Sequence, residues 1–236
     1  IVQNAHRIVE GQMPIKGGRD DDFFMIESTG LACQRLICDL VSTRLPKSYG
    51  YDPVRDIQVL CPTKVGPTGS VELNRRLQAI LNPPAPDKPQ IIWEQSGRVL
   101  RCGDKVMQIK NCDEISNGDI GYITKICKAG DETTVTIDFG DGRTAEYDTS
   151  QLDMLDLGYA STIHKSQGSE YRSVIINLQC AHYVMLTRPL VYTAITRGKE
   201  NVIIVGERRA LCMAIKKTDT EKRGTCLAKR LRAAMQ

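Results

Sequence analysis

The sequence has few aromatic residues, no long apolar run and no P-loop. Aromatic residues make up 5% of the 236 residues, with one Trp and three Phe, so platforms for ring stacking are sparse. No apolar run is long enough to cross a bilayer and no secretory signal opens the chain, so we expect no membrane partner. The signature GxxxxGK[ST] does not occur, which excludes a P-loop cradling β- and γ-phosphates within these residues.

The nine cysteines show no pattern typical of disulfides or of zinc. Their number is odd, no two are spaced as CxxC, and several lie in apolar runs such as Ile57–Cys61. Such thiols behave as small buried hydrophobes in a reducing compartment. We therefore predict a cytoplasmic protein with no metal site.

The charge of the chain is mildly basic. A formal net charge of +4 comes from 32 basic and 28 acidic residues. This excess permits a nucleic-acid partner but fits an ordinary surface equally well. The helical stretch from Glu207 onward is more basic than the rest. We interpret it as a solvated helix face or tail, with a patch for nucleic-acid backbone as the alternative.

Buried-type strands alternate with amphipathic helices in the first third of the chain. Phe23–Ile26 and Ile57–Cys61 are apolar runs of strand length, and residues 31–45 and 70–81 carry apolar side chains at helical spacing. Ser70 is placed to cap the second helix. This alternation predicts an α/β sheet with mainly parallel strands.

A proline-rich loop then marks a change of architecture. Asn82–Pro89 holds four prolines and cannot form regular structure. Short alternating strands follow, at residues 105–109, 120–126, 134–139 and 143–147, with Asp141-Gly142 as a hairpin turn. They predict a small β-barrel inserted into the α/β domain. We set the α/β domain at residues 1–94 with 155–236 and the barrel at 95–154.

The segment Tyr159–Glu170, with the sequence YASTIHKSQGSE, precedes a buried-type strand. A helix over it would place two sets of side chains on opposite sides: Ser161, Thr162, Lys165 and Ser166 on one, and Ala160, Ile163, His164 and Gln167 on the other. Hydroxyls and a lysine in a row can bond successive phosphates of a single strand without reading its bases. After the tight turn that Gly168 permits, backbone amides and Glu170 can face the phosphate and ribose of a nucleotide. The alternative is a solvated helix before a core strand.

A second segment, Val191–Lys199, is predicted to have the same form of helix, glycine and strand. Its expected buried face is made of Leu190, Val191, Ala194 and Ile195. Arg197 stands at the exposed end of the helix, before Gly198. A planar guanidinium can neutralise charge on two oxygens at once, so Arg197 could point at a γ-phosphate bound by another domain. The alternative is a surface salt bridge.

In this order and spacing, the stretches TIHKSQGSE (162–170) and YTAITRGK (192–199) resemble motifs V and VI of superfamily 1 DNA helicases of the RecD/TraA-like branch. Gly198 departs from the alanine of many members. Further similar segments extend the resemblance over nearly the whole chain to about residue 210: 4–14, 59–74 and 103–121, the last with the family's inserted barrel of the Src-homology-three type.

The resemblance implies the second RecA-like motor domain of an ATP-dependent DNA helicase, which is an ATP hydrolase with 5′→3′ polarity. Such a helicase would act in repair, recombination or conjugation. By the family pattern, Arg197 would be the catalytic arginine finger. Gly168, Ser169, Glu170 and Arg197 would contact the nucleotide. Single-stranded DNA would lie along Thr63, Lys64, Thr162, His164, Lys165 and Ser166, although core packing beside Ile163 stays open for His164.

Without a P-loop, these residues would form a C-terminal fragment that is inactive alone. ATP and Mg²⁺ would be bound mainly by a missing N-terminal motor domain. The alternative function is a non-catalytic module on the same fold that binds nucleic acid or docks a partner protein.

Overall fold

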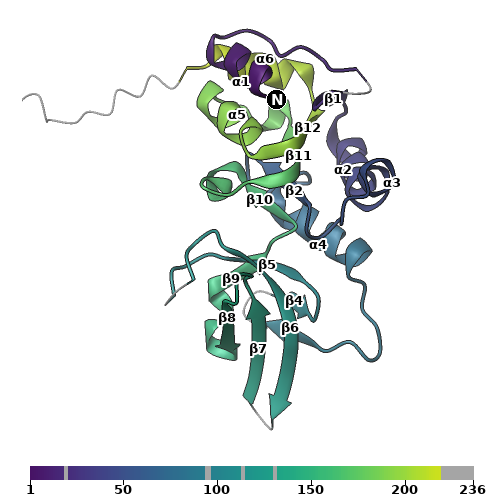
Figure 1. Cartoon of the computed structure of the whole chain (residues 1–236), viewed down its shortest axis with the longest axis vertical. Helices are drawn as coiled ribbons and strands as arrows, with labels where there is room; N and C mark the ends of the chain where they lie inside the picture. Colours follow the sequence, from purple (N-terminus) through teal and green to yellow (C-terminus); the bar gives the residue numbers. More distant parts are fainter. Residues whose placement is uncertain (19–20, 94–96, 113–114, 130–131, 219–236) are drawn as a thin grey trace, which may run out of the picture.

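The computed structural model describes residues 1–18, 21–93, 97–112, 115–129 and 132–218. A five-stranded parallel sheet occupies one half of the molecule and has the strand order β1-β12-β11-β2-β10 (Figure 1). Its strands are β1 (Phe23–Glu27), β2 (Ile57–Cys61), β10 (Ala160–Thr162), β11 (Tyr171–Leu178) and β12 (Gly198–Gly206). The predicted α/β class and the two predicted strands at residues 23–26 and 57–61 are therefore confirmed.

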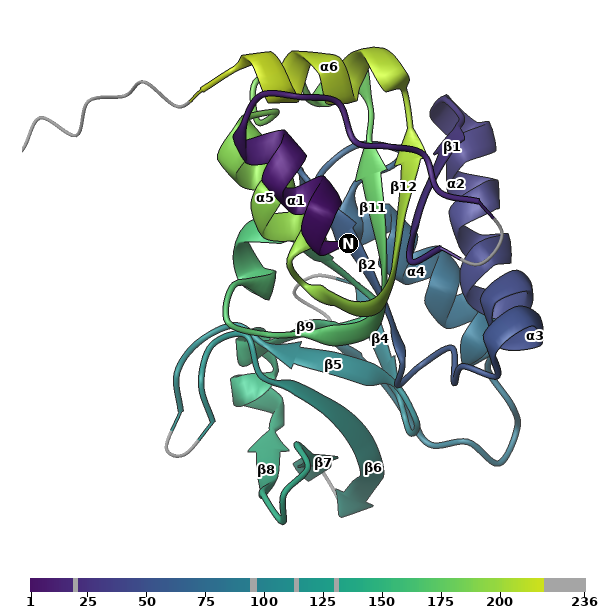
Figure 2. The same ribbon diagram turned by 45° about the horizontal axis from the view of Figure 1, so that its top comes forward.

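Helices cover both faces of this sheet (Figure 2). One face carries α1 (Val2–Val9), α5 (Arg188–Ile195) and α6 (Arg208–Lys216); the other carries α2 (Gly30–Asp39), α3 (Leu45–Tyr49) and α4 (Ser70–Leu81), with a π-helical segment at Leu40–Arg44 between α2 and α3. None of these helices is long and apolar enough to cross a membrane in the part of the chain that the structure describes.

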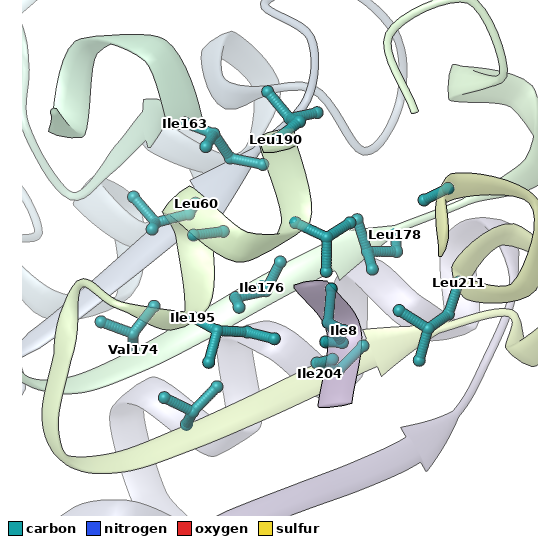
Figure 3. Packing of buried hydrophobic residues seen from close by; sticks show 14 of the residues in the cluster. Ile8, Leu60, Ile163, Val174, Ile176, Leu178, Leu190, Ile195, Ile204 and Leu211 are labelled. Atoms are coloured by element: carbon teal, nitrogen blue, oxygen red, sulfur yellow. The ribbon is translucent and has the colours of Figure 1, made fainter. Parts of the chain in front are cut away.

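The central strands explain why both faces are covered. Side chains alternate along β11, so Val174 and Ile176 pack with α1, α5 and α6 (Figure 3), while Ile175 packs with α2 and α4. The same alternation on β12 sends Ile204 to the first core and Ile203 to the second. A strand that is apolar on both sides must be buried on both sides, which is typical of parallel sheets.

The second half of the molecule is a five-stranded antiparallel sheet with the order β8-β7-β6-β5-β9. Its strands are β5 (Lys105–Gln108), β6 (Ile120–Ala129), β7 (Glu132–Asp138), β8 (Thr144–Asp148) and β9 (Leu155–Leu157). Asp141 and Gly142 have φ of 55° and 74°, as the predicted hairpin turn requires. The four predicted strands are confirmed, whereas β9 and the separate hairpin of β3 (Gln90–Trp93) and β4 (Arg98–Arg101) were not predicted as such.

Some details of the predicted helices were wrong. The helix predicted at residues 31–45 begins at Gly30 but is divided by the π-helical segment. Ser70 is the first residue of α4 and makes no capping bond, because the cap position falls on Gly69. Leu73 and Leu77 face the core as expected, but Ile80 is 48% exposed.

Asp104, just before β5, joins the two halves of the molecule. Its fully buried carboxylate accepts hydrogen bonds from Gln78 Nε2 (2.6 Å) and Asn82 Nδ2 (2.7 Å) of α4 and its end, from Tyr159 Oη (2.9 Å) and from the Arg101 amide (2.7 Å). Burial raises the pKa of this carboxyl, against the lowering effect of the four donors. The antiparallel sheet is thus attached to α4 by a buried polar network.

Replacing Asp104 by alanine should strongly destabilise the fold, because buried donors would lose their acceptor. We expect Asp104→Ala to lower the free energy of unfolding by about 3 kcal/mol. Urea unfolding followed by the fluorescence of Trp93, the one Trp, measures it. Asp153→Ala is the control, since Asp153 pairs with Lys110 at the surface and should cost less than about 1 kcal/mol. Equal losses in the two variants would contradict the structural role of Asp104.

Lys105 lies beside Asp104 and is 1% exposed. Its ammonium donates a hydrogen bond to the Ile57 carbonyl oxygen of β2 (3.1 Å) and lies 5.9 Å from the ring centroid of Tyr171. Burial lowers the pKa of Lys105 to about 7, although the carboxylates of Asp52 and Asp56 partly raise it. The buried amine is therefore not available to a ligand outside the protein in this position.

The depressed pKa of Lys105 predicts a pH-dependent stability. Between pH 7 and 10.5 the unfolded lysine still holds a proton that the folded amine has released, so stability rises with pH across this window and is flat below it. Relative to Lys105→Met, the wild-type free energy of unfolding should therefore increase by up to about 1.4 kcal/mol per pH unit. Urea unfolding of both proteins at three pH values measures this difference; parallel profiles would show that Lys105 titrates normally.

Candidate functional site

The segment Tyr159–Glu170 is not the predicted helix. Residues 160–162 form strand β10, which pairs with β2 in parallel, and Ile163–Ser166 make one 3₁₀ turn. In β10 the backbone forms hydrogen bonds with the edge of β2, which a short helix would not make. This tertiary pairing overrides the helical pattern of the sequence. As a result, the two predicted sides are not observed: Ser161 and Ser166 are buried, and His164 and Gln167 are exposed.

Two of the predicted DNA-contacting residues, Ser166 and His164, differ from each other in accessibility. Ser166 is fully buried and its hydroxyl donates to the Ile163 carbonyl oxygen at 2.8 Å, so it stabilises the turn from inside. His164 is on the surface, and the alternative that it packs in the core beside Ile163 is wrong. Gly168 has φ of +89°, which confirms the tight turn predicted at this glycine.

The segment 191–199 follows the prediction more closely. Helix α5 starts at a cap where the Thr187 hydroxyl accepts from the Leu190 amide (3.4 Å). The predicted buried face is confirmed, with all of its members in the core: Leu190, Val191, Ala194 and Ile195. The helix ends at Ile195, so Arg197 lies between α5 and β12.

Arg197 is fixed by neutral acceptors. Its Nε donates to the Thr193 carbonyl oxygen (3.1 Å), Nη1 to the Ser169 carbonyl oxygen (3.0 Å) and Nη2 to the Thr196 hydroxyl (3.2 Å). The backbone adds a bond from the Tyr171 amide to the Arg197 carbonyl oxygen (2.8 Å). The Gly168–Ser169 turn and Arg197 therefore come together, although 28 positions separate Ser169 from Arg197.

The alternative of a surface salt bridge at Arg197 is wrong for the described part of the chain. No carboxylate there lies within ion-pair distance of Arg197. The neighbouring Glu170 instead pairs with Lys199 at 3.4 Å. Arg197 is half-buried and carries a positive charge that no described carboxylate neutralises, which suits the binding of an external anion.

The predicted DNA-contacting residues Thr63, Lys64 and Thr162 lie at the carboxyl end of β2. Thr63 and Lys64 follow β2, while Thr162 ends β10 and pairs with Cys61, the last residue of β2. The ammonium nitrogens of Lys64 and Lys165 lie 3.6 Å and 3.4 Å from the same oxygen, Oδ2 of Asp156. Carboxyl ends of parallel strands are a common place for ligands, and two lysines converge there.

The two groups of residues are not side by side. Ser173 of β11 pairs with Ile57, the first residue of β2, so residues 168–170 and Arg197 lie near the amino end of β2. Thr162 lies at its carboxyl end. Residues 163–170 run from one end to the other, and this single segment connects the candidate nucleotide site with the candidate DNA site.

A cavity of about 440 Å³ opens beside Lys64 and Lys165. Its lining also includes charged side chains that the sequence analysis did not single out: Arg75 of α4, Arg98 and Arg101 of β4, and Asp156 of β9. Burial lowers the pKa of Lys165, and the charges of Lys64 and Arg98 lower it further against the opposing effect of Asp156. Arg98 and Asp156 are 58 positions apart, so no local signal in the sequence could have joined them.

Comparison with known proteins identifies related domains in both halves. Residues 73–139 match the family described as "ATP-dependent RecD-like DNA helicase SH3 domain", and residues 157–205 match "UvrD-like helicase C-terminal domain". The ATP-dependent RecD2 DNA helicase of Deinococcus radiodurans is 36% identical over 239 residues, which cover 99% of this chain and 30% of that protein. The RecBCD enzyme subunit RecD of Mycobacterium tuberculosis is 32% identical over 158 residues, covering 67% of this chain and 26% of that protein.

Solved structures share the fold. The Pif1 helicase from Candida albicans has a TM-score of 0.51 at 15% identity, covering 100% of this chain and 57% of that one. The Bacteroides Pif1 helicase in complex with ADP-AlF₃ and ssDNA has a TM-score of 0.50 at 18% identity, covering 99% and 53%. The chain spans less than a third of the length of the two curated relatives. The resemblance inferred from the motifs and the predicted fold class are confirmed.

Proposed function

We propose that this chain, which belongs to the RecD-like superfamily 1 helicases, is the second motor domain of an ATP-dependent DNA helicase. The observation that carries the proposal is the contact of Arg197 with the Gly168–Ser169 turn, which holds a guanidinium without a described carboxylate partner beside that turn. ATP and Mg²⁺ are held mainly by a first motor domain that carries the P-loop and is not among these residues.

In this proposal Arg197 acts as the arginine finger. Domain closure brings the γ-phosphate towards Arg197, whose bonds to the neutral Ser169 carbonyl and Thr196 hydroxyl exchange for bonds to phosphate oxygens. A charge-assisted bond to phosphate is stronger than the neutral-acceptor bonds that it replaces. The Ser169 amide already donates to the Ser166 carbonyl oxygen at 3.1 Å. In this proposal the nucleotide next to Arg197 is therefore contacted by Gly168, by the Ser169 side chain and by Glu170. The guanidinium neutralises negative charge in the transition state of phosphoryl transfer.

Single-stranded DNA lies across the other end of β2, along Thr63, Lys64, Thr162, His164 and Lys165. Lysines and hydroxyls in this row grip phosphates without reading sequence. Ser166 supports the turn that carries these residues instead of touching DNA. The Bacteroides Pif1 complex with ADP-AlF₃ and ssDNA supports both ligands for this fold. When the domains close, residues 163–170 move, and the side chains that bind DNA move with them.

The domain division belongs to the proposal as well. Residues 1–94 with 155–236 form the motor domain, and 95–154 form the inserted Src-homology-three-like domain, although β9 extends the antiparallel sheet to Leu157. A cytoplasmic location fits the eight described cysteines, none of which is in a disulfide.

A non-catalytic module that binds nucleic acid or a partner protein is the second candidate, because the P-loop is absent from these residues. The natural gene upstream of the Ile1 codon decides between the two. A P-loop in frame, followed by a buried strand that ends in Asp-Glu, supports the motor. A start codon at or near Ile1 favours the binding module.

Arg197→Ala should abolish most ATP hydrolysis in the full-length polypeptide with its P-loop. We expect kcat of DNA-stimulated hydrolysis to fall by about 10³-fold, as for other arginine fingers, with single-strand binding unchanged. Arg35→Ala is the matched control, since Arg35 is exposed on α2, which covers the face of the sheet opposite to α5. A loss of less than about tenfold in Arg197→Ala would remove the finger role.

The lysines of the DNA track should contribute salt-dependent affinity. Lys165→Ala and Lys64→Ala should each weaken binding of an oligothymidylate to the 236-residue chain. Each should also reduce the slope of log affinity against log salt by about 0.7, the value for one single-strand phosphate contact. Fluorescence anisotropy of a labelled strand measures both quantities. Lys47→Ala on the exposed surface of α3 is the control, and equal effects of all three variants would argue against a track.

A further inference from the structure

Asp156 of β9 holds three cations from three different segments. Its Oδ1 contacts Nη1 of Arg98 on β4, and its Oδ2 faces Lys165 Nζ at 3.4 Å and Lys64 Nζ at 3.6 Å. Arg98 and Asp156 have side chains that are each 27% exposed. The cluster lines the 440 Å³ cavity, so it is open to a ligand.

The three cations are not held equally. Arg98 Nη1 also donates to the Leu155 carbonyl oxygen at 2.8 Å, and its guanidinium lies 4.5 Å from the ring centroid of Trp93. Within the described residues, Lys64 and Lys165 have Asp156 as their one carboxylate partner. Because Arg98 takes Oδ1, both lysines share Oδ2 at distances longer than the 2.7–2.9 Å of a good charged hydrogen bond.

The other two arginines that line the cavity, Arg75 and Arg101, already have partners of their own. Arg75 is paired with Glu72 of its own helix at 2.8 Å, and Arg101 Nε donates to Gln90 Oε1 at 3.0 Å. The cavity therefore has several positive charges around one central carboxylate. Arg98 takes Oδ1 of Asp156, so the two lysines share Oδ2. A DNA phosphate has two unesterified oxygens free, so it can accept a hydrogen bond from each lysine at a normal distance.

We propose that Asp156 is a built-in competitor of DNA phosphate, which occupies Lys64 and Lys165 when the strand is absent and yields them when it binds. This inference rests on the proposed DNA track. This competition lowers the affinity of Lys64 and Lys165 for each phosphate by a fixed amount. A domain that must release and rebind a strand repeatedly gains from such a limit, since an unopposed cluster would hold one phosphate too long.

Asp156→Asn tests the proposal because it removes the charge and keeps the shape. We expect the 236-residue chain to bind a fluorescein-labelled oligothymidylate of about 12 nucleotides roughly fivefold more tightly at about 50 mM salt. The slope of log affinity against log salt should steepen by about 0.7 to 1.4, for one or two additional phosphate contacts. Fluorescence anisotropy over a salt series gives both values.

Asp153→Asn is the matched control. It makes the same change of charge nearby, but Asp153 pairs with Lys110 outside the cavity, so affinity should change by less than about twofold. A second control places Asp156→Asn in a Lys64→Ala/Lys165→Ala background. If the gain passes through the two lysines, it disappears there, which a merely structural role of Asp156 would not produce.

The outcomes are distinct. Unchanged or weaker binding by Asp156→Asn, while the wild type binds the strand, overturns the competitor role and leaves the DNA track standing; weaker binding would show that Asp156 positions the lysines. Absence of binding by the wild type and both variants overturns the track and the competitor together. If Asp156→Asn does not fold, as judged by circular dichroism, Asp156→Ser replaces it with the same expected gain.

Discussion

The backbone pairing of strand β2 is the interaction on which the rest of the structure depends. This strand pairs with β11 on one side and with β10 on the other. Its first carbonyl oxygen, that of Ile57, accepts the hydrogen bond of the buried Lys105 from the antiparallel sheet. A strand that is engaged on both edges and buried along its whole length cannot shift without breaking all of these bonds. This bond to β2 and the Asp104 network with α4 together place the two sheets relative to each other.

This placement separates the two candidate sites and also links them. The Arg197 contact with Ser169 lies near the amino end of β2, and Lys64 and Thr162 lie at its carboxyl end. Residues 163–170 run between the two ends and are held in the middle by the buried hydroxyl of Ser166. Rigid strands transmit little relative motion, whereas a short irregular segment pinned at one point can rock. In the proposed function, this segment therefore couples the nucleotide site to the DNA site.

Long apolar runs made most of the fold predictable from the sequence. β2, β11 and β12 are buried on both faces, so their composition alone predicts strands, and the face of α5 follows from helical spacing. β10 could not be predicted, because three residues carry no period and its pairing with β2 is a tertiary effect. The burial of Lys105 and the meeting of Arg98 with Asp156 also depend on long-range register, which a single sequence does not encode in any local pattern.

The charges at the two sites differ in a way that bears on mechanism. Arg197 is fixed by neutral acceptors and has no described carboxylate partner; in the proposed function this charge meets a phosphate that another domain presents. Lys64 and Lys165 are instead partly neutralised by a carboxylate of the adjacent sheet. A site that must stabilise one transition state benefits from an unopposed charge, whereas a site that must grip and release a polymer benefits from an opposed one. In the proposed function, the same domain thus meets opposite electrostatic requirements at the two ends of β2.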